Sequence, residues 1–223
     1  MNLVKSYDFF KPEEVEGRIH IIGCGSVGSA VAENLARFGL TKFSLWDFDV
    51  VEEKNVANQM FTSKHIGMLK TDATEQIILD INPAAAPDIK KYPKGYEGQI
   101  LSGFVFLCAD NIDLRRQIVE KHKMNPNVKA MFDFRTRLTD AQHYAADWSN
   151  PDQVQNLLNS MQFTSDEADQ DTPVSACGGI LGVATTVRFI VAVGVDNFVN
   201  FVKGGGIKKF VMADAFAMQV DAF

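Results

Sequence analysis

A glycine-rich turn constrains the fold of this chain more than any other feature. Residues 18–23 (RIHIIG) form a short β-branched run that predicts a strand, and apolar residues at helical spacing over 27–38 predict a helix. Between them lies the pattern GxGxxG, formed by Gly23, Gly25 and Gly28. In this arrangement backbone N–H groups can approach a phosphate at the positive end of the helix dipole. The turn therefore predicts an α/β nucleotide-binding fold.

The alternation of strand and helix continues to residue 134. Helices are predicted from about 64 to 79, with Ser63 as the cap, and over 112–122. Further strands are predicted at 42–46, 103–108 and 128–134, with a short extended piece at 85–89. The nearly all-apolar run GFVFLC is typical of a parallel strand covered on both faces. We therefore expect an α/β, Rossmann-like doubly wound sheet that is parallel in its N-terminal part.

The pattern changes beyond Arg135, where no further parallel strand is predicted. Residues 141–147 indicate an extended edge, 152–162 a helix, and 208–213 a last strand. The sheet is therefore expected to become mixed toward the C-terminus. At 223 residues, the chain length predicts a single domain over 1–223. Its nucleotide-binding core is placed at 18–134 and its C-terminal strands and helices at 135–223.

Two further segments of the C-terminal part differ sharply in composition. The run 165–172 (SDEADQDT) is acidic and lacks large apolar residues, so we expect a mobile loop over 163–176. It is either a plain surface linker or a substrate-gating loop. The apolar run that follows, 178–202, contains Arg188 and is interpreted as a buried helix rather than a membrane span.

Charge and cysteine content exclude several classes of function. The chain has 22 Lys and Arg against 28 Asp and Glu, a formal charge of -6, which argues against a broad surface for nucleic acid or an anionic membrane. Three isolated cysteines exclude a disulfide framework and a CxxC zinc knuckle. No signal peptide is predicted at residues 1–11. A cytoplasmic protein is expected.

Asp47 follows the second predicted strand, nineteen residues after Gly28. A carboxylate there can accept hydrogen bonds from a ribose hydroxyl. On these two features alone NAD is the leading ligand, with another nucleotide or a purely structural glycine turn as alternatives.

The segment after this strand carries a resemblance to a known family. Residues 47–59 read DFDVVEEKNVANQ, which resembles the DxDxVxxxNxxRQ segment of the ThiF/MoeB/HesA superfamily, the adenylyltransferases related to ubiquitin-activating enzymes. Two more blocks occur in the same order as in that superfamily: Lys70 in a helix that ends in INP at 81–83, and CADN at 108–111. The resemblance covers residues 18–134 and is closest to the compact members that lack zinc.

This resemblance implies an ATP-dependent adenylyltransferase that activates a carboxylate as an acyl adenylate. The carboxylate implied is the C-terminal glycine of a ubiquitin-like or sulfur-carrier protein. The resemblance also implies ATP and Mg²⁺ as cofactors and a homodimer or pseudo-symmetric heterodimer. Its motifs assign the glycine turn, Asp47, Asp49, Asn55 and Gln59 to nucleotide binding, Lys70 to the triphosphate, and Asp110 to the metal.

Each assignment has a structural alternative. Asp110 could cap the helix that follows it, and Lys70 could be a solvated helix residue. Asp49 and Asn55 could merely close turns through side-chain hydrogen bonds to the backbone.

One position departs from the superfamily pattern. Asn58 stands where an arginine usually precedes the glutamine, and an amide cannot supply a fixed positive fork to phosphates. Either another arginine compensates or adenylation is weak. The candidates are Arg115, Arg116, Arg135, Arg137 and Arg18, or an arginine delivered by a second subunit, since the superfamily works as dimers. Arg115 is assigned a catalytic role because it falls one turn into the helix after Asp110. Two alternatives to an adenylyltransferase stay open for the whole chain: an NAD(P)-dependent oxidoreductase and a degenerate, half-active scaffold subunit.

Cys177 is the only cysteine placed as an acyl-accepting nucleophile, because it precedes two glycines at a predicted helix start. The alternative is a small buried residue. Cys24 and Cys108 fall in the glycine turn and in a buried strand, so both are expected to be packing residues.

Overall fold

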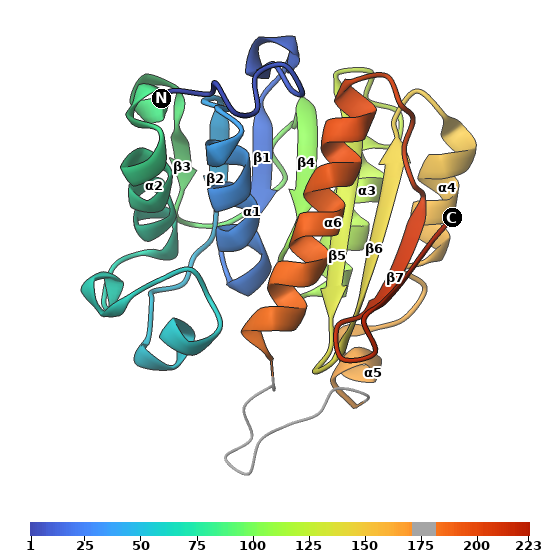
Figure 1. Cartoon of the computed structure of the whole chain (residues 1–223). Coiled ribbons are helices and arrows are strands. Elements are labelled where there is room, and N and C mark those ends of the chain that lie inside the picture. Colours follow the sequence, from blue (N-terminus) through green and yellow to red (C-terminus); the bar gives the residue numbers. More distant parts are fainter. Residues whose placement is uncertain (171–181) are drawn as a thin grey trace.

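A computed structural model of the chain describes residues 1–170 and 182–223. Its centre is one eight-stranded sheet with the order β3-β2-β1-β4-β5-β6-β7-β8 (Figure 1). The pairs among β1 to β5 are parallel, and the pairs from β5 to β8 are antiparallel. The predicted sheet, parallel first and mixed toward the C-terminus, is confirmed. The strands are β1 (Ile19–Ile22), β2 (Phe43–Trp46), β3 (Lys90–Tyr92), β4 (Gly103–Leu107), β5 (Val128–Thr136), β6 (Asp140–Asp147), β7 (Phe210–Asp214) and β8 (Gln219–Ala222).

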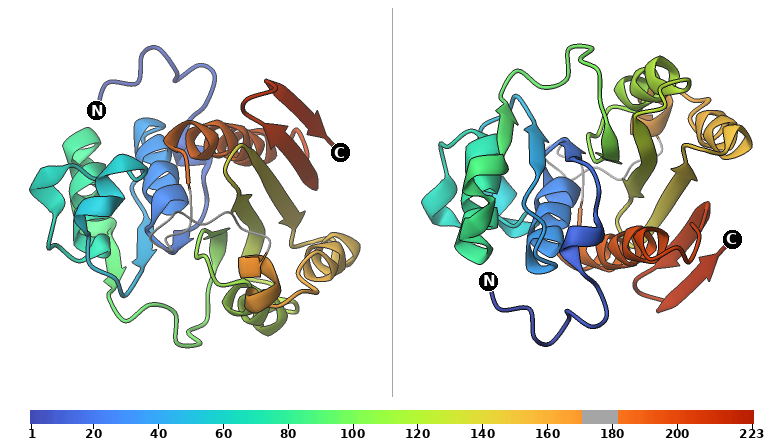
Figure 2. Two further views of the ribbon diagram at one scale, coloured as in Figure 1. Left: turned by 90° about the horizontal axis from the view of Figure 1, so that it is seen from below. Right: turned by 90° about the horizontal axis from the view of Figure 1, so that it is seen from above.

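Helices cover both faces of the sheet (Figure 2). One face carries α1 (Ser26–Arg37), α2 (Lys70–Ile81) and α6 (Ala184–Val202), and the other carries α3 (Ile112–His122) and α4 (Pro151–Asn159). A short α5 (Ser165–Gln170) follows α4, and short 3-10 helices lie at Pro12–Glu14, Glu53–Ala57, Ser63–His65 and Pro83–Asp88.

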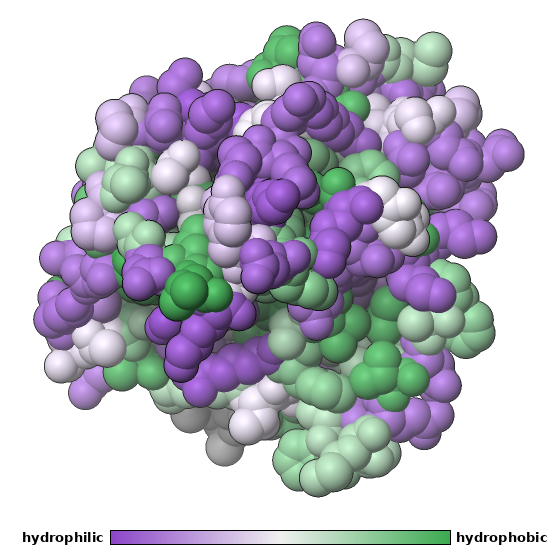
Figure 3. All heavy atoms as spheres, turned by 45° about the horizontal axis from the view of Figure 1, so that its top comes forward, coloured by the Kyte–Doolittle hydropathy of each residue, from purple (hydrophilic) through white to green (hydrophobic). Residues whose placement is uncertain are grey.

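The core lies in two layers because strand residues alternate between the faces. Ile19 and Ile21 of β1 face α1 and α6, whereas Ile22 faces α3 and α4. Every residue of β1, β2 and β4 is buried, as predicted for parallel strands covered on both sides. The antiparallel end of the sheet leaves several large apolar side chains exposed: Met212, Phe216, Met218, Val220 and Phe223. Others are exposed in the connections of the parallel part, such as Phe48 and Ile100. Figure 3 shows one face of the molecule as mainly hydrophilic, with hydrophobic residues gathered toward its lower right.

The long helix α6 packs against the sheet as a core helix. By length and composition it could cross a membrane, but half of the segment is buried inside the protein. A Cβ on Gly194 would lie 2.2 Å from a ring carbon of Phe134, so the helix and β5 are in close contact at this point. The predicted buried helix is therefore present, although it begins at Ala184 and the predicted start at 178 lies outside the described residues.

The start of α2 differs from the prediction. Ser63 does not cap a long helix, because residues Ser63–His65 form only a 3-10 turn that Thr62 caps together with His65. Gly67 then takes φ +86°, a left-handed conformation that ends the turn. The helix begins at Lys70 rather than at about residue 64.

The short extended piece predicted at 85–89 is also absent. Residues Pro83–Asp88 form a 3-10 helix, because Pro83 suits its first turn and the Ala85 N–H donates to the Asn82 carbonyl oxygen (3.0 Å). The strand is instead Lys90–Tyr92, at the edge of the sheet.

Two predictions in the C-terminal third were wrong. The strand β6 is not an edge, because β7 and then β8 pair beyond it, and β8 was missed. A mobile loop was predicted over 163–176, but residues 165–170 of it form the helix α5, and 171–176 lie outside the described residues. Thr164 and Glu167 exchange hydrogen bonds between side chain and backbone, a reciprocal cap that begins a helix.

Candidate active site

A cleft of about 1350 Å³ opens at the carboxyl ends of the parallel strands. The chain leaves β1 toward β2 and β3, then returns to add β4 on the other side of β1, so β1 and β4 flank the point where the strand order reverses. Ligands of open α/β sheets bind at such a point. The cleft is lined by nearly all the predicted site residues: Gly23, Gly25, Asp47, Asp49, Asn55, Gln59, Lys70, Asp110 and Arg115. Gly28 is buried in α1 and does not line the cleft, and Cys177 lies outside the described residues.

The three glycines of the turn have different tasks. Gly23 has φ +91°, and a Cβ there would lie 2.6 Å from the Ala109 backbone nitrogen, so only glycine lets the ends of β1 and β4 meet. A Cβ on Gly28 would lie 1.8 Å from the Gly23 carbonyl oxygen. Nothing lies within 4 Å of a Cβ on Gly25, which borders the open cleft. Gly23 and Gly28 therefore close the turn, and Gly25 keeps its surface open for a ligand.

Asp47 joins the end of β2 to the glycine turn. Its carboxylate accepts hydrogen bonds from the backbone N–H groups of Cys24 (2.7 Å) and Asp49 (2.8 Å). Burial raises the pKa of Asp47, and these two hydrogen bonds oppose the rise. The carboxylate is thus fixed at the wall of the cleft, where its remaining lone pairs can accept hydrogen bonds.

Lys70 is buried at the start of α2, and its ammonium group is paired. The Lys70 Nζ lies 2.6 Å from Asp49 Oδ2, and the side chain is only 10% exposed against 50% for Asp49. An isolated β-bridge between Val50 and Leu69 holds the segment after β2, which carries Asp49, against the start of α2. The predicted alternative of a solvated lysine is therefore wrong.

The segment 52–59 forms the outer wall of the cleft. Asn55 closes a capping box with Glu52, because its side-chain oxygen accepts the Glu52 N–H (2.9 Å). Gln59 Oε1 is buried and has no hydrogen-bond partner among the described residues. A buried acceptor without a partner is costly, so its place beside the cleft favours a ligand with a donor or a cation. Asn58 also lines the cleft, near Gly182.

Asp110 is exposed to the cleft and does not cap α3. The cap is Asn111, whose side-chain oxygen accepts the Leu114 N–H (2.8 Å). No group of three or more acidic, histidine or cysteine side chains is arranged to hold a metal ion within residues 1–170 and 182–223. A single carboxylate that faces the cleft nevertheless fits Mg²⁺, which is commonly held by one or two carboxylates together with substrate phosphates and water.

Arg115 lies at the cleft wall, but its donors are directed into the protein. Its guanidinium donates to the carbonyl oxygens of Ala109 (2.6 Å) and Phe134 (2.6 Å) and to Asp133 Oδ1 (2.7 Å). Asp133 is fully buried and also accepts from Arg135 Nε (2.7 Å). Arg115 therefore ties the loop before Asp110 to β5.

The other predicted arginines are dispersed. Arg18 donates to the carbonyl oxygens of Phe43 and Asp88, both at 2.7 Å, at the amino end of the sheet. Arg116 pairs with Asp113 on α3 and does not line the cleft. Arg135 and Arg137 both line it.

Sequence reasoning missed the wall that follows β3. Lys94, Gly95 and Tyr96 of this wall line the cleft, and Phe48, which follows β2, lines it beside Gly95. Their position in the sequence could have identified them, because a segment that follows a parallel strand leaves the sheet at the same edge as the carboxyl ends of the other parallel strands. The short strand Lys90–Tyr92 was not predicted, so residues 94–96 were not expected to lie at the cleft.

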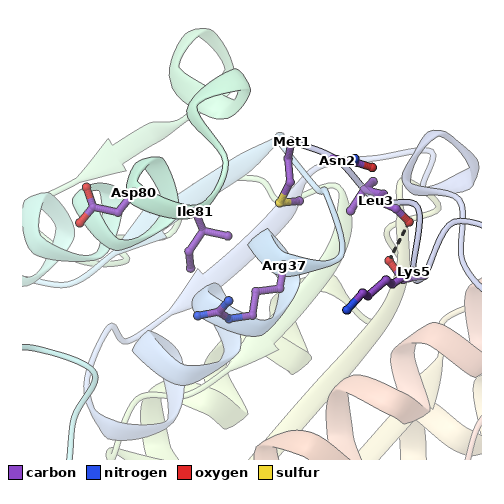
Figure 4. Close-up of a pocket in the computed structure, with 8 residues that line it drawn as sticks. Met1, Asn2, Leu3, Lys5, Arg37, Asp80 and Ile81 are labelled. Carbon is purple, nitrogen blue, oxygen red and sulfur yellow. Dashed lines mark hydrogen bonds between the residues drawn. The ribbon is translucent and has the colours of Figure 1, made fainter.

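A second, smaller hollow of about 490 Å³ lies at the opposite end of the sheet (Figure 4). It is formed where the segment of Met1 to Ser6 passes the last turns of α1 and α2, and Arg37 and Asp80 lie on its rim. None of the predicted site residues lines it.

Residues 14–187 match the model of the ThiF family. The chain belongs to the ThiF family. Ubiquitin-like modifier-activating enzyme 5 of Arabidopsis thaliana is 39% identical over 83 residues, which cover 37% of this ThiF-family chain and 18% of that protein.

Solved structures of E. coli MccB have the same fold as this ThiF-family chain. MccB with MccA-N7isoASN has a TM-score of 0.73 at 14% identity, covering 95% of this chain and 66% of MccB. MccB with ATP has a TM-score of 0.69 at 15% identity, covering 95% and 65%. At such low identity the likeness shows the fold alone. The chain spans less than a fifth of the Arabidopsis relative and about two thirds of MccB.

Proposed function

We propose that this ThiF-family chain is an ATP-dependent adenylyltransferase that activates a carboxylate as an acyl adenylate. The observation that carries the proposal is the meeting of Asp47, Lys70 and Asp110 in one cleft beside the glycine turn. These residues come from three separate segments, so a structural role for each alone would not bring them together. The MccB structure with bound ATP, which shares this fold, supports the choice of nucleotide.

Catalysis of this kind depends on positioning and charge stabilisation. The open surface at Gly25 admits a phosphate to the backbone of the turn, and the Asp47 carboxylate accepts hydrogen bonds from the ribose. The Lys70 ammonium, oriented by Asp49, neutralises charge on the triphosphate as pyrophosphate leaves. Asp110 would hold Mg²⁺, which when bound neutralises phosphate oxygens.

The substrate carboxylate we propose is the C-terminal glycine of a ubiquitin-like or sulfur-carrier protein. The curated relatives are ubiquitin-like modifier-activating enzymes, and one solved MccB structure contains MccA, which supports a small protein or peptide as the partner. We further propose that the chain works in the cytoplasm as a homodimer or a pseudo-symmetric heterodimer.

The decisive experiment is exchange of labelled pyrophosphate into ATP with Mg²⁺ and a panel of small proteins that end in Gly-Gly. Wild type is compared with Asp110→Asn, and Asp113→Asn serves as a matched control because Asp113 lies one turn away and does not line the cleft. We expect exchange to fall roughly 100-fold in Asp110→Asn and to persist in the control.

Other outcomes separate the alternatives. ATP binding without exchange for any carboxylate would favour a half-active scaffold subunit. Binding of NADH without binding of ATP would sink the proposal in favour of a nicotinamide-dependent oxidoreductase.

Cys177 is proposed as an acyl acceptor on the sequence alone. In that case, wild-type protein supplied with ATP and its partner forms a thioester that hydroxylamine cleaves. Cys177→Ala, which has no nucleophilic side chain, stops at the adenylate, so intact-mass measurement shows no acyl adduct on the protein.

A further inference from the structure

Six cationic side chains from residues 1–170 and 182–223 line the cleft: Lys54, Lys70, Lys94, Arg115, Arg135 and Arg137. Within the described residues, the first two of these are paired with acidic neighbours, Lys54 with Glu52 (2.8 Å) and Lys70 with Asp49 (2.6 Å). Arg115 and Arg135 share the buried carboxylate of Asp133, both at 2.7 Å. Lys94 and Arg137 form no ion pair in this part of the chain, so no carboxylate there holds their charged groups.

These two residues lie on opposite sides of the cleft. Lys94 follows β3, and the nearby Tyr92 carbonyl oxygen accepts the Asp47 N–H (3.3 Å), which places Lys94 on the side proposed for the ribose. Arg137 follows β5. Since Leu107 of β4 pairs with Asp133 of β5, Arg137 and Asp110 leave adjacent parallel strands at the same edge, a few residues beyond that pair. Arg137 is therefore on the metal side of the cleft.

The backbone at Arg137 is held in place although its side chain is exposed. Its N–H donates to the Asp140 carbonyl oxygen (2.8 Å), which closes the β5–β6 turn. The Oγ1 of Thr186, a residue only 1% exposed, donates to the Leu138 carbonyl oxygen (2.9 Å) and fixes the turn to the first turn of α6. These two hydrogen bonds fix the backbone of the turn from which the Arg137 side chain reaches the cleft.

We propose that Arg137 binds the β- and γ-phosphates of ATP. The inference rests on the proposed function and deepens it, since it names the residue that does what Asn58 cannot. A guanidinium can bind two phosphate oxygens at once through parallel N–H donors, which an amide or a lysine cannot reproduce. Arg115 and Arg135 do not compete for this role, because Asp133 and main-chain oxygens already accept from them.

Calorimetric binding of Mg-ATP and of AMP to purified protein tests the proposal. Arg137→Ala is expected to weaken ATP binding about tenfold or more and to leave AMP binding within about twofold, because AMP lacks the phosphates concerned. Arg137→Lys recovers only part of the loss, since a point charge replaces the fork. Arg116→Ala, which removes a partly buried arginine outside the cleft, is the control and binds both nucleotides as wild type does.

Two results would overturn the assignment. The first is wild-type affinity for ATP in Arg137→Ala. The second is an equal loss for ATP and AMP, which points to a structural role of the turn, and a thermal melt of each variant checks for that.

Failure of this inference is distinguishable from failure of the proposed function. Pyrophosphate exchange by wild type, together with unchanged ATP binding in Arg137→Ala, removes the inference and keeps the function. Weaker ATP binding by Arg137→Ala, together with no pyrophosphate exchange by wild type for any carboxylate, keeps the inference and removes the proposed adenylyltransferase activity. Absence of ATP binding by wild type removes both.

Discussion

The ammonium nitrogen of Lys70 lies 2.6 Å from Oδ2 of Asp49, and the backbone N–H of Lys70 also donates to the carbonyl oxygen of Asp49 (2.9 Å). The acidic partner is half-exposed and the lysine is buried, so the ammonium is oriented before any ligand arrives. A buried charge that is already positioned costs little reorganisation when it meets phosphate.

Removing this charge is expected to abolish most of the activity. Lys70→Ala should reduce pyrophosphate exchange by roughly 100-fold or more, because no other described cation occupies this wall of the cleft in a buried position. Lys64→Ala breaks a comparable but exposed ion pair with Asp80 (3.1 Å) outside the cleft. Exchange by that control should equal wild type, and equal losses in the two variants would contradict a specific role for Lys70.

Two glycine-to-alanine substitutions should separate binding from folding. At Gly25 the added methyl group meets open space at φ -78°, so Gly25→Ala should fold normally but weaken ATP binding about tenfold by occupying the phosphate surface. At Gly28 the methyl group would lie 1.8 Å from a carbonyl oxygen, so Gly28→Ala should melt at a markedly lower temperature. Thermal melts and calorimetry with ATP distinguish the two. A Gly25→Ala protein that binds ATP normally would show that the turn does not contact phosphate.

The carboxylate shared by Arg115 and Arg135 should be important for stability. Asp133→Asn leaves the buried Arg115 guanidinium without its charged partner, which is expected to lower the free energy of unfolding by about 3–5 kcal/mol. Glu16→Gln breaks an exposed pair with Lys129 (3.4 Å) and should leave the urea midpoint unchanged. Equal midpoints for Asp133→Asn and wild type would refute this account.

Stability should fall as the pH drops from about 6.5 toward 4. Burial lowers the pKa of His143 to about 4, and its neutral ring accepts from Asn197 Nδ2 (3.1 Å) while Nδ1–H donates to the Asp133 carbonyl oxygen (3.0 Å). Burial also lowers the pKa of His20 to about 4. In the unfolded chain both groups take up protons near pH 6.5, so unfolding binds protons throughout this window and the folded state loses stability.

The loss is at most about 1.4 kcal/mol per pH unit for each histidine. Urea unfolding at pH 6.5 and 5 measures it. His143→Gln, which keeps a polar side chain but cannot titrate, should show a shallower dependence on pH than wild type. An identical dependence in both proteins would exclude His143 as a contributor.

Local signals were sufficient to predict much of the parallel half of the sheet. The β-branched runs and helical spacing identified β1, α1, β4 and α3 within one or two residues. The two strands are short apolar runs, and the two helices carry apolar residues at helical spacing and are bounded by glycine or a cap. The start of α2 was missed because a left-handed Gly67 stops the chain before Lys70, and a positive φ cannot be read from a glycine alone. The strand β8 was missed because its polar sequence, QVDA, is stabilised by pairing with β7.

The candidate site was predictable as a set of residues but not as a set of contacts. Motif order placed Asp47, Lys70 and Asp110 correctly at one cleft. Sequence could not show that Asn111 rather than Asp110 caps α3, or that Arg115 turns inward, because both depend on which partners the fold brings within reach. The preference for Arg137 over Arg115 and Arg135 likewise depends on the hydrogen-bond partners of each arginine in the fold.

The position of β1 in the sheet has a consequence for synthesis. Ile19 pairs with Phe43 of β2, 24 residues later, and with Phe104 of β4, 85 residues later. At roughly 5–20 residues per second, β1 waits several seconds on the ribosome before its second neighbour exists. During that interval an apolar strand with unpaired backbone groups is open on one side. A nascent chain that stalls before residue 103 keeps this edge exposed and should be a target for chaperones or for aggregation.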